Sequence, residues 1–229
     1  VDFLPDRRKI RSWVGFNRKT MVVDRHQGLR LRARKLAAAA AALKHQSGQT
    51  VPFSLAFLTD HTRIAQPEVI ARVLPRGAAV ILRDYESPQR VGLAKRLSVI
   101  CKARGVFLLV GNDPDLAIAV NADGVHCPRW SKLKQADLPD RFIMTAGCHN
   151  DTELITANER GATMALLSPA FPTNSHIGKA GIGIAAFKSL ADQAPLPVIA
   201  LGGVTPVNAH QLTSPNVVGI AAIGAFNAN

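Results

Sequence analysis

The chain has 229 residues, a length that suits one α/β barrel or two small domains. Its hydrophobic fraction is 47% and its aromatic fraction 5%, so a core must be built mainly from aliphatic side chains. Cys101, Cys127 and Cys148 form no CxxC pair, and an odd number suits a reducing, cytoplasmic compartment better than a disulfide framework. No apolar run approaches the ~20 residues that span a bilayer, and no apolar signal core opens the sequence, so no membrane partner is expected.

The formal net charge is +12, and most of it lies near the N-terminus. Residues 1–45 contain twelve Lys and Arg against three Asp, whereas the rest contains sixteen against thirteen acidic residues. Residues 1–26 show no sustained period and are interpreted as a basic arm, with residues 27–229 as a single barrel domain. Residues 28–45 are rich in strong helix formers and predict a helix.

The basic segment has two possible roles, nucleic-acid binding and a structural one. Its charge would suit a polyanion, but it has no nucleic-acid motif and few aromatic side chains for stacking bases. We therefore favour a structural role, in which the Ala and Leu side chains of residues 28–45 cover the N-terminal end of the domain while the basic side chains reach water. Residues 1–20 are expected to be dispensable.

From residue 52 onward, short apolar runs recur along the chain. Most are apolar throughout rather than alternating, which is typical of strands buried on both faces. The runs cover residues 52–60, 78–84, 105–113, 122–126, 141–147, 163–169, 196–203 and 217–225.

Stretches between these runs have helix signals. Residues 87–105 open with Ser-Pro and close at a glycine, and residues 151–161 open with Asp and also end at a glycine. Eight strand–helix units predict a (β/α)8 TIM barrel. A doubly wound open sheet is the alternative, but it predicts fewer strands and usually a glycine-rich turn after the first, where this chain reads LTDHTR.

Glycines follow the last two runs, in LGGVTP and AIGAF. The C-terminal ends of barrel strands surround the active site, and backbone N–H groups after the last two strands often bind phosphate. Gly202, Gly203, Ile223 and Gly224 are therefore candidate phosphate-binding residues. The alternative is ordinary turn chemistry.

The loop after the sixth run, residues 171–183, combines hydroxyl side chains with three glycines. Its length and composition predict a mobile lid over an anion. We expect Thr173 and Ser175 to contact phosphate and His176 to contact the substrate.

Four further side chains stand at strand ends. His149 follows the fifth run and has either a catalytic or a structural role. Arg83 follows the second and either pairs with phosphate or with an Asp at the barrel top. Asp113 is either a lone metal ligand, completed by phosphate oxygens, or the N-cap of the next helix. His126 is interpreted as satisfying backbone groups at the end of the fourth strand.

Seven short motifs, in this order, resemble the thiamine phosphate synthase/TenI family over about residues 52–226. The motifs are LTDxxR, LRD, GND…DLAIAVNADGVH, GCHN, SPAFPTNS, PVIALGGVTPVN and VVGIAAIGAF. The resemblance implies a cytosolic (β/α)8 barrel in thiamine biosynthesis. Synthase members join a hydroxymethylpyrimidine diphosphate to a thiazole phosphate with magnesium, and TenI members isomerise the thiazole phosphate or have no settled role.

The resemblance implies roles for the positions that match the family. These positions are Arg83, Asn112, Asp113, His149, Gly202 and Gly203. Among them, His149 would be the acid/base of the TenI branch, Asn112 would contact substrate and Asp113 would bind magnesium.

The departures from the family fall on the side that handles diphosphate and magnesium. Ile81 and Tyr85 stand where synthases have Gln and Lys, and Ser131 stands where they have a second magnesium-binding Asp. Gly147 replaces a phosphate-binding Ser, and His176 replaces the Lys of the lid. A diphosphate leaving group needs its developing charge neutralised, so these losses argue against efficient synthase activity.

We therefore expect a TenI-like thiazole tautomerase that binds a small phosphorylated thiazole, with His149 as acid/base. Weak, magnesium-dependent synthase activity and a non-catalytic thiamine-precursor-binding protein are the alternatives. No cofactor is expected apart from Mg²⁺ if synthase activity remains. The sequence leaves homo-oligomerisation open.

Overall fold

The computed structural model describes residues 7–172 and 182–226, and between residues 7 and 26 it describes the backbone alone. Eight parallel strands form a closed barrel in chain order, and β1 pairs with β8 through Leu55 opposite Ile220. The strands are β1 (Leu55–Leu58), β2 (Ala79–Leu82), β3 (Phe107–Gly111), β4 (Gly124–Cys127), β5 (Ile143–Cys148), β6 (Met164–Leu167), β7 (Val198–Leu201) and β8 (Val217–Ala222). The predicted (β/α)8 barrel is confirmed, since each strand lies within or one residue beyond a predicted apolar run.

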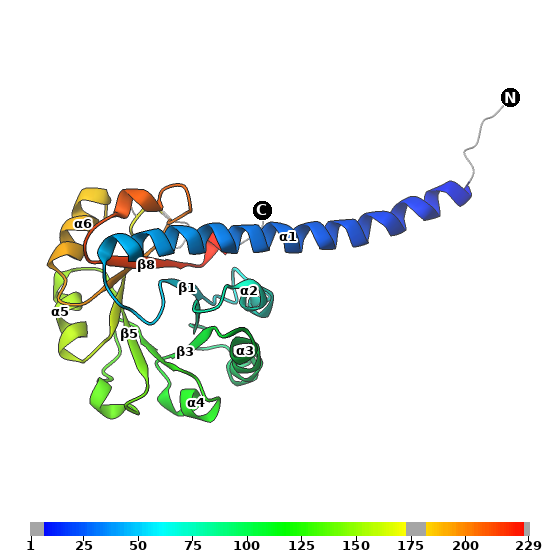
Figure 1. Ribbon diagram of the computed structural model, residues 1–229. Coiled ribbons are helices and arrows are strands. Elements are labelled where there is room, and N and C mark those ends of the chain that lie inside the picture. Colours follow the sequence, from blue (N-terminus) through cyan, green and yellow to red (C-terminus); the bar gives the residue numbers. More distant parts are fainter. Residues whose placement is uncertain (1–6, 173–181, 227–229) are drawn as a thin grey trace.

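Helices lie around the outside of the barrel (Figure 1). They are α1 (Arg7–Ser47), α2 (Pro67–Val73), α3 (Arg90–Arg104), α4 (Pro114–Ala119), α5 (Asp151–Glu159) and α6 (Ile184–Gln193). Short 3-10 turns take the helix position after β4 and β7, as η1 (Gln135–Asp137) and η3 (Ala209–Leu212), and a further short turn, η4 (Gly224–Phe226), follows β8. No helix among the described residues is long and apolar enough to cross a membrane.

The ends of two helices follow the sequence signals closely. Gly105 ends α3 with a left-handed backbone, φ 61°, and its N–H donates to the carbonyls of the last turn. The N-cap of α5 is Asn150, whose side chain accepts the N–H of Glu153 at 2.9 Å, one residue before the Asp expected to open the helix. At α3 the expected start was early, because Ser87 forms a separate turn and the helix begins at Arg90.

Helix α1 is longer than the helix expected over residues 28–45, and it begins at Arg7. From residue 27 onward, where the structure describes its side chains, the buried ones recur at intervals of four and three residues: Leu29, Ala33, Leu36, Ala40 and Leu43. This spacing places one narrow face of the helix against the barrel. The earlier turns give no such pattern in the sequence, so their helical conformation could not be recognised from periodicity.

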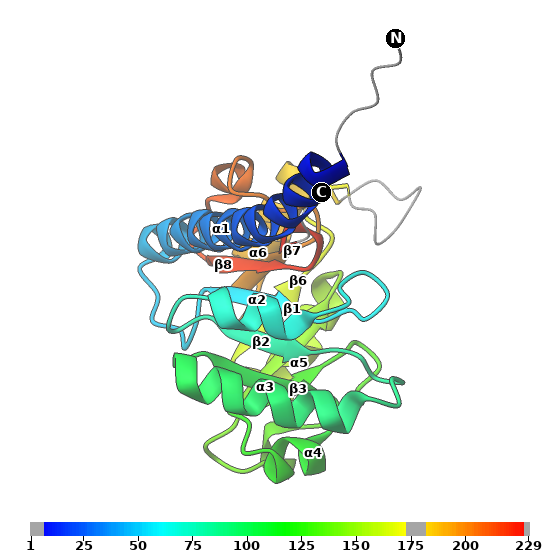
Figure 2. The same cartoon turned by 90° about the vertical axis from the view of Figure 1, so that its right-hand side faces the viewer.

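The position expected for this helix, across the N-terminal end of the barrel, is wrong. Figures 1 and 2 show α1 lying along the outside of β8, with its N-terminal part extending past the barrel. Each other strand is followed by its own covering element, so α1 fills the place beside β8 from the opposite end of the chain. The separation of residues 1–26 as an arm from a domain over 27–229 stays a prediction.

Candidate active site

A cavity of about 270 Å³ opens at the C-terminal ends of the strands. Leu58, Leu166, Leu201 and Ile223 give it an apolar base. Around them stand the polar and aromatic side chains of Arg83, Tyr85, His126, Arg129, Trp130, His149 and Ser168. An apolar base with a few convergent polar groups is typical of a small-molecule site.

A second cavity of about 310 Å³ adjoins the first beyond β7 and β8. The two cavities share Leu201, Gly202 and Ile223 in their walls. Gly203 and Gly224 also line the second cavity, so all four predicted phosphate-binding residues of the last two strands lie together. One elongated ligand could therefore occupy both spaces.

Gly202 and Gly203 cannot be replaced without a clash. Both have positive φ, 94° and 64°. A Cβ on Gly202 would lie 2.9 Å from the Cα of Pro169, and one on Gly203 would lie 2.5 Å from the carbonyl oxygen of Pro172. The two interpretations of these glycines are therefore both correct: they form a tight turn, and their bare backbone lines the cavity.

Arg63 supplies a cation to the second cavity. A Cβ on Gly224 would lie 2.5 Å from the Arg63 Nη2, so the guanidinium lies directly over the glycine backbone. Guanidinium groups and backbone N–H groups are both favourable partners for phosphate. The sequence places Arg63 at the end of the first strand, but only the fold shows that it reaches the glycines after β8.

His149 lies in the wall of the first cavity, directly after β5, and its side chain is 39% exposed. Its Nδ1 is 3.0 Å from Oε2 of Glu153, and its backbone N–H donates to the same oxygen at 2.8 Å. A carboxylate only accepts hydrogen bonds, so this contact places the proton on Nδ1 and leaves Nε2 for another partner. The sequence analysis does not identify Glu153 as a partner of His149, although a carboxylate four residues after a histidine is a recognisable signal for such a pair.

His126 is buried in the same cavity wall, where its Nδ1 is 2.9 Å from the Thr145 hydroxyl oxygen. Its contact is thus a side chain, and not the backbone groups expected from the sequence. Burial lowers the pKa of His126 to about 4, and the charge of Arg83 acts in the same direction. The ring is neutral at physiological pH and can offer one hydrogen bond to a ligand.

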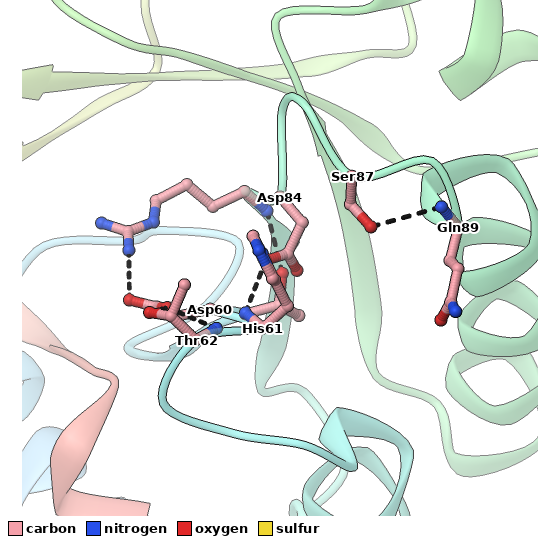
Figure 3. Close-up of polar contacts among 8 residues, drawn as sticks. Asp60, His61, Thr62, Asp84, Ser87 and Gln89 are labelled. Atoms are coloured by element: carbon pink, nitrogen blue, oxygen red, sulfur yellow. Dashed lines mark hydrogen bonds and ion pairs between the residues drawn. The ribbon is translucent and has the colours of Figure 1, made fainter.

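The loops after β1 and β2 are tied together by polar contacts (Figure 3). Arg83 donates from Nη2 to Oδ2 of Asp60 at 2.6 Å, and the Thr62 hydroxyl donates to the other carboxylate oxygen at 2.6 Å. The barrel-top ion pair weighed for Arg83 is therefore present. Since Arg83 also lines the cavity, it can meet an anionic substituent of a ligand at the same time.

His61 and Asp84 form a neighbouring pair (Figure 3). The backbone N–H of His61 donates to Oδ1 of Asp84 at 2.7 Å, and its Nδ1 lies 2.9 Å from the same oxygen. Burial opposes ionisation of Asp84, but hydrogen bonds from Thr59 and His61 outweigh it and hold its pKa below the usual value. This charged carboxylate fixes the β1 loop beside the cavity.

Asp113 is committed to structural contacts. Its Oδ1 accepts the N–H of Leu116 at 3.0 Å as the N-cap of α4, and its Oδ2 lies 3.8 Å from Nε of Arg90. Beside it, Asn112 has a left-handed backbone and a buried Oδ1 to which no described residue donates a hydrogen bond. The N-cap weighed for Asp113 is present, and a guanidinium rather than a second carboxylate faces it.

These contacts test the fit of a magnesium ion, which the family resemblance implies. Ser131, at the position of the second metal-binding Asp, is buried, and its hydroxyl accepts the N–H of Leu133 at 3.3 Å. Within residues 27–172 and 182–226, no group of three or more His, Cys, Asp or Glu side chains is arranged for a metal. The described donor set does not fit magnesium, which needs several hard oxygen ligands.

Three predicted site residues, Thr173, Ser175 and His176, lie outside the described residues. The lid expected over residues 171–183 therefore stays a prediction.

The sequence comparisons with known proteins point to one family. Residues 55–226 match the family model described as thiamine monophosphate synthase. A thiamine-phosphate synthase of Methanoculleus marisnigri is 31% identical over 165 residues, which cover 68% of this chain and 78% of the relative. The chloroplastic thiamine biosynthetic bifunctional enzyme of Arabidopsis thaliana is 30% identical over 174 residues, 69% of this chain but only 32% of that enzyme.

Among solved structures, the thiamine phosphate pyrophosphorylase from Pyrococcus furiosus superimposes with a TM-score of 0.66 at 24% identity. The match covers 78% of this chain and 89% of that structure. At this identity, the likeness shows a shared barrel fold.

Proposed function

This chain belongs to the thiamine monophosphate synthase family, and on that premise we propose that it binds a thiazole phosphate and interconverts its tautomers. The observation that carries the proposal is the pair of joined cavities. A cationic, glycine-lined space adjoins an apolar space that contains a carboxylate-oriented histidine. This arrangement suits a small ring with a phosphate on a short tether.

The phosphate would lie in the second cavity, between the Arg63 guanidinium and the backbone of Gly202, Gly203 and Gly224. The thiazole ring would then lie over Leu166, Leu201 and the other apolar side chains of the first cavity. A carboxyl group on the ring would meet Arg83, which lines the first cavity after β2, away from the glycines that follow β7 and β8.

His149 would move the proton. With Nδ1–H held by Glu153, Nε2 is free to accept a proton from one position of the substrate and to return it at another. The reaction gains and loses no atom, because the imidazole ends each turnover as it began. Glu153 acts through His149, by orienting the ring and stabilising the transient imidazolium.

The names of the relatives favour a second candidate, synthase activity, in which a thiazole phosphate displaces diphosphate from a pyrimidine. The contacts of Asp113 and Ser131 oppose it, since neither offers a free oxygen pair for a metal. An assay with both substrates and added Mg²⁺ separates the two: thiamine phosphate formed at a rate comparable with tautomer conversion would favour the synthase.

The proposal is tested by following both thiazole tautomers by NMR with the wild-type chain, His149→Ala and a matched control, His210→Ala. His210 is exposed on η3, outside both cavities. We expect His149→Ala to lower the rate by about 100-fold or more and His210→Ala to leave it unchanged. Binding of thiazole phosphate by the wild type without any conversion would instead support a non-catalytic precursor-binding protein.

A further inference from the structure

Trp130 is a large apolar side chain that lies in the cavity wall yet remains 58% exposed. Indole rings usually bury most of their surface, because leaving it in water forgoes much of their hydrophobic stabilisation. An exposed aromatic side chain at the edge of a cavity therefore points to a contact with a ligand.

The turn that carries Trp130 is fixed by the fold. The N–H of Ser131 donates to the carbonyl of Pro128 at 2.8 Å, which closes the turn directly after β4. The guanidinium of Arg160, just beyond α5, donates to the carbonyl oxygen of Ser131. Trp130 is thus presented to the cavity by an anchored backbone.

Tyr85 supports the indole from one side. The two rings meet edge to face, with centroids 5.6 Å apart and an interplanar angle of 68°. Tyr85 itself lies tightly against the backbone of Gly111, where a Cβ would come within 2.7 Å of its Cε1, and under the Arg90 guanidinium, 5.6 Å from the ring centroid. Because Gly111 and Arg90 restrict the Tyr85 ring, this ring offers Trp130 a fixed surface to pack against.

This aromatic pair lies after β2 and β4, whereas the glycine-lined cavity lies after β7 and β8. A ligand anchored by its phosphate at the glycines extends across the barrel mouth toward the aromatic pair. None of the described residues that line either cavity is Asp or Glu, while Arg83 and Arg129 line the aromatic side. These charges favour an occupant of this side that is either neutral or anionic.

We infer that Trp130, supported edge-on by Tyr85, is the specificity-determining residue of the cavity and stacks on the planar heteroaromatic ring of a phosphate monoester. The inference rests on the proposed function for the placement of the phosphate. It adds that the ring is selected by its flat aromatic face, so that a saturated group of the same size loses this contact.

The experiment uses the full chain with Trp13→Phe, which leaves Trp130 as the sole tryptophan. Two probes share a phosphate monoester: hydroxyethylthiazole phosphate and n-pentyl phosphate. We expect saturable quenching of Trp130 fluorescence by the thiazole probe and little change with the pentyl probe. Trp130→Ala should raise the Kd for the thiazole probe about tenfold, while the Kd for pentyl phosphate changes less than twofold.

Trp130→Leu separates stacking from plain apolar contact, because it keeps a large apolar side chain without a π face. Its Kd should resemble that of Trp130→Ala. Because Trp130 is exposed, both variants should keep the thermal unfolding midpoint of the parent chain. The inference would be overturned if Trp130→Ala lost affinity equally for both probes or for neither, or if Trp130→Leu restored the affinity for the thiazole probe. So would fluorescence that responds to protein concentration and not to the ring, since that result assigns Trp130 to a contact between copies.

Failure of the two proposals can be told apart. Selective binding of the ring through Trp130 without tautomer conversion would remove the tautomerase and leave this inference standing. Conversion with no discrimination between the probes would remove this inference alone.

Discussion

Oε2 of Glu153 accepts both the backbone N–H and the Nδ1–H of His149, at 2.8 and 3.0 Å. The double contact fixes the position of the imidazole as well as its tautomer. It also joins the end of β5 to the first turn of α5, so the geometry of the proposed acid/base depends on the Asn150 cap that begins this helix.

Glu153→Gln tests this relationship. The amide keeps the size of the carboxylate but cannot stabilise an imidazolium, so we expect kcat to fall by about tenfold while the Kd for thiazole phosphate stays within twofold. Steady-state kinetics and calorimetry measure the two quantities. Added to His149→Ala, Glu153→Gln should cause little further loss of kcat, because the two residues act together and each substitution already disables the pair. Independent, multiplicative losses would contradict a positioning role.

Gly203→Ala tests the glycine wall. Both its positive φ and the contact of a Cβ with the carbonyl of Pro172 oppose the substitution. The matched control is Gly77→Ala, with φ 78° and no atom within 4 Å of its Cβ. We expect each to lose about 1 kcal/mol of unfolding free energy from backbone strain, with a further loss only at Gly203. Phosphate affinity should fall at Gly203 alone. Equal effects in thermal unfolding and in phosphate titration would show that the wall is not closely packed.

The lowered pKa of buried His126 makes the stability of the folded protein depend on pH. Its pKa is about 4 in the folded protein, below the ordinary value of 6.5, so the unfolded chain binds more protons between these values. Stability from this residue is present above pH 6.5 and is lost as the pH falls toward 4, by about 2 kcal/mol at pH 5. Denaturant unfolding at pH 7 and pH 5 measures this loss. The decrease should be smaller in His126→Gln by this amount, and an identical decrease would refute the assignment.

A chain that begins at Met21 tests the basic segment. Among the α1 side chains that the structure describes, from residue 27 onward, the first buried one is Leu29, and the N-terminal part of the helix extends past the barrel (Figure 1). We therefore expect the truncation to change the melting temperature by no more than about 2 °C. The full chain and the truncated chain should also elute from immobilised DNA at similar, low salt. A large loss of stability would place residues 1–20 within the fold, and tight DNA retention at physiological salt that the truncation abolishes would favour a nucleic-acid role.

The barrel could be predicted from the sequence because its strands are buried on both faces and are therefore apolar throughout. Val217–Ala222 is an example, fully buried along its length. The extent and position of α1 could not be predicted, because the contact of this helix with β8 joins opposite ends of the chain. Periodicity reports a buried face and not the element that buries it.

For the site, strand-end residues such as His149 and Gly202 could be predicted because the fold fixes where strand ends lie. Partners brought by tertiary contact could not, since Arg63 meets Gly224 only when β1 closes against β8. Trp130 had no signal in the sequence, because exposure at a cavity edge is a property of the assembled barrel.

The most direct test of the central claim, that His149 transfers a proton on a ring held in the joined cavities, is turnover in D₂O followed by NMR. The account predicts that the wild-type chain converts the tautomer, with solvent deuterium in the product to the extent that the imidazolium proton exchanges before it is returned, and that His149→Ala converts it at least about 100-fold more slowly, with thiazole phosphate still bound. Tautomer conversion or deuterium incorporation by His149→Ala at the wild-type rate would contradict it.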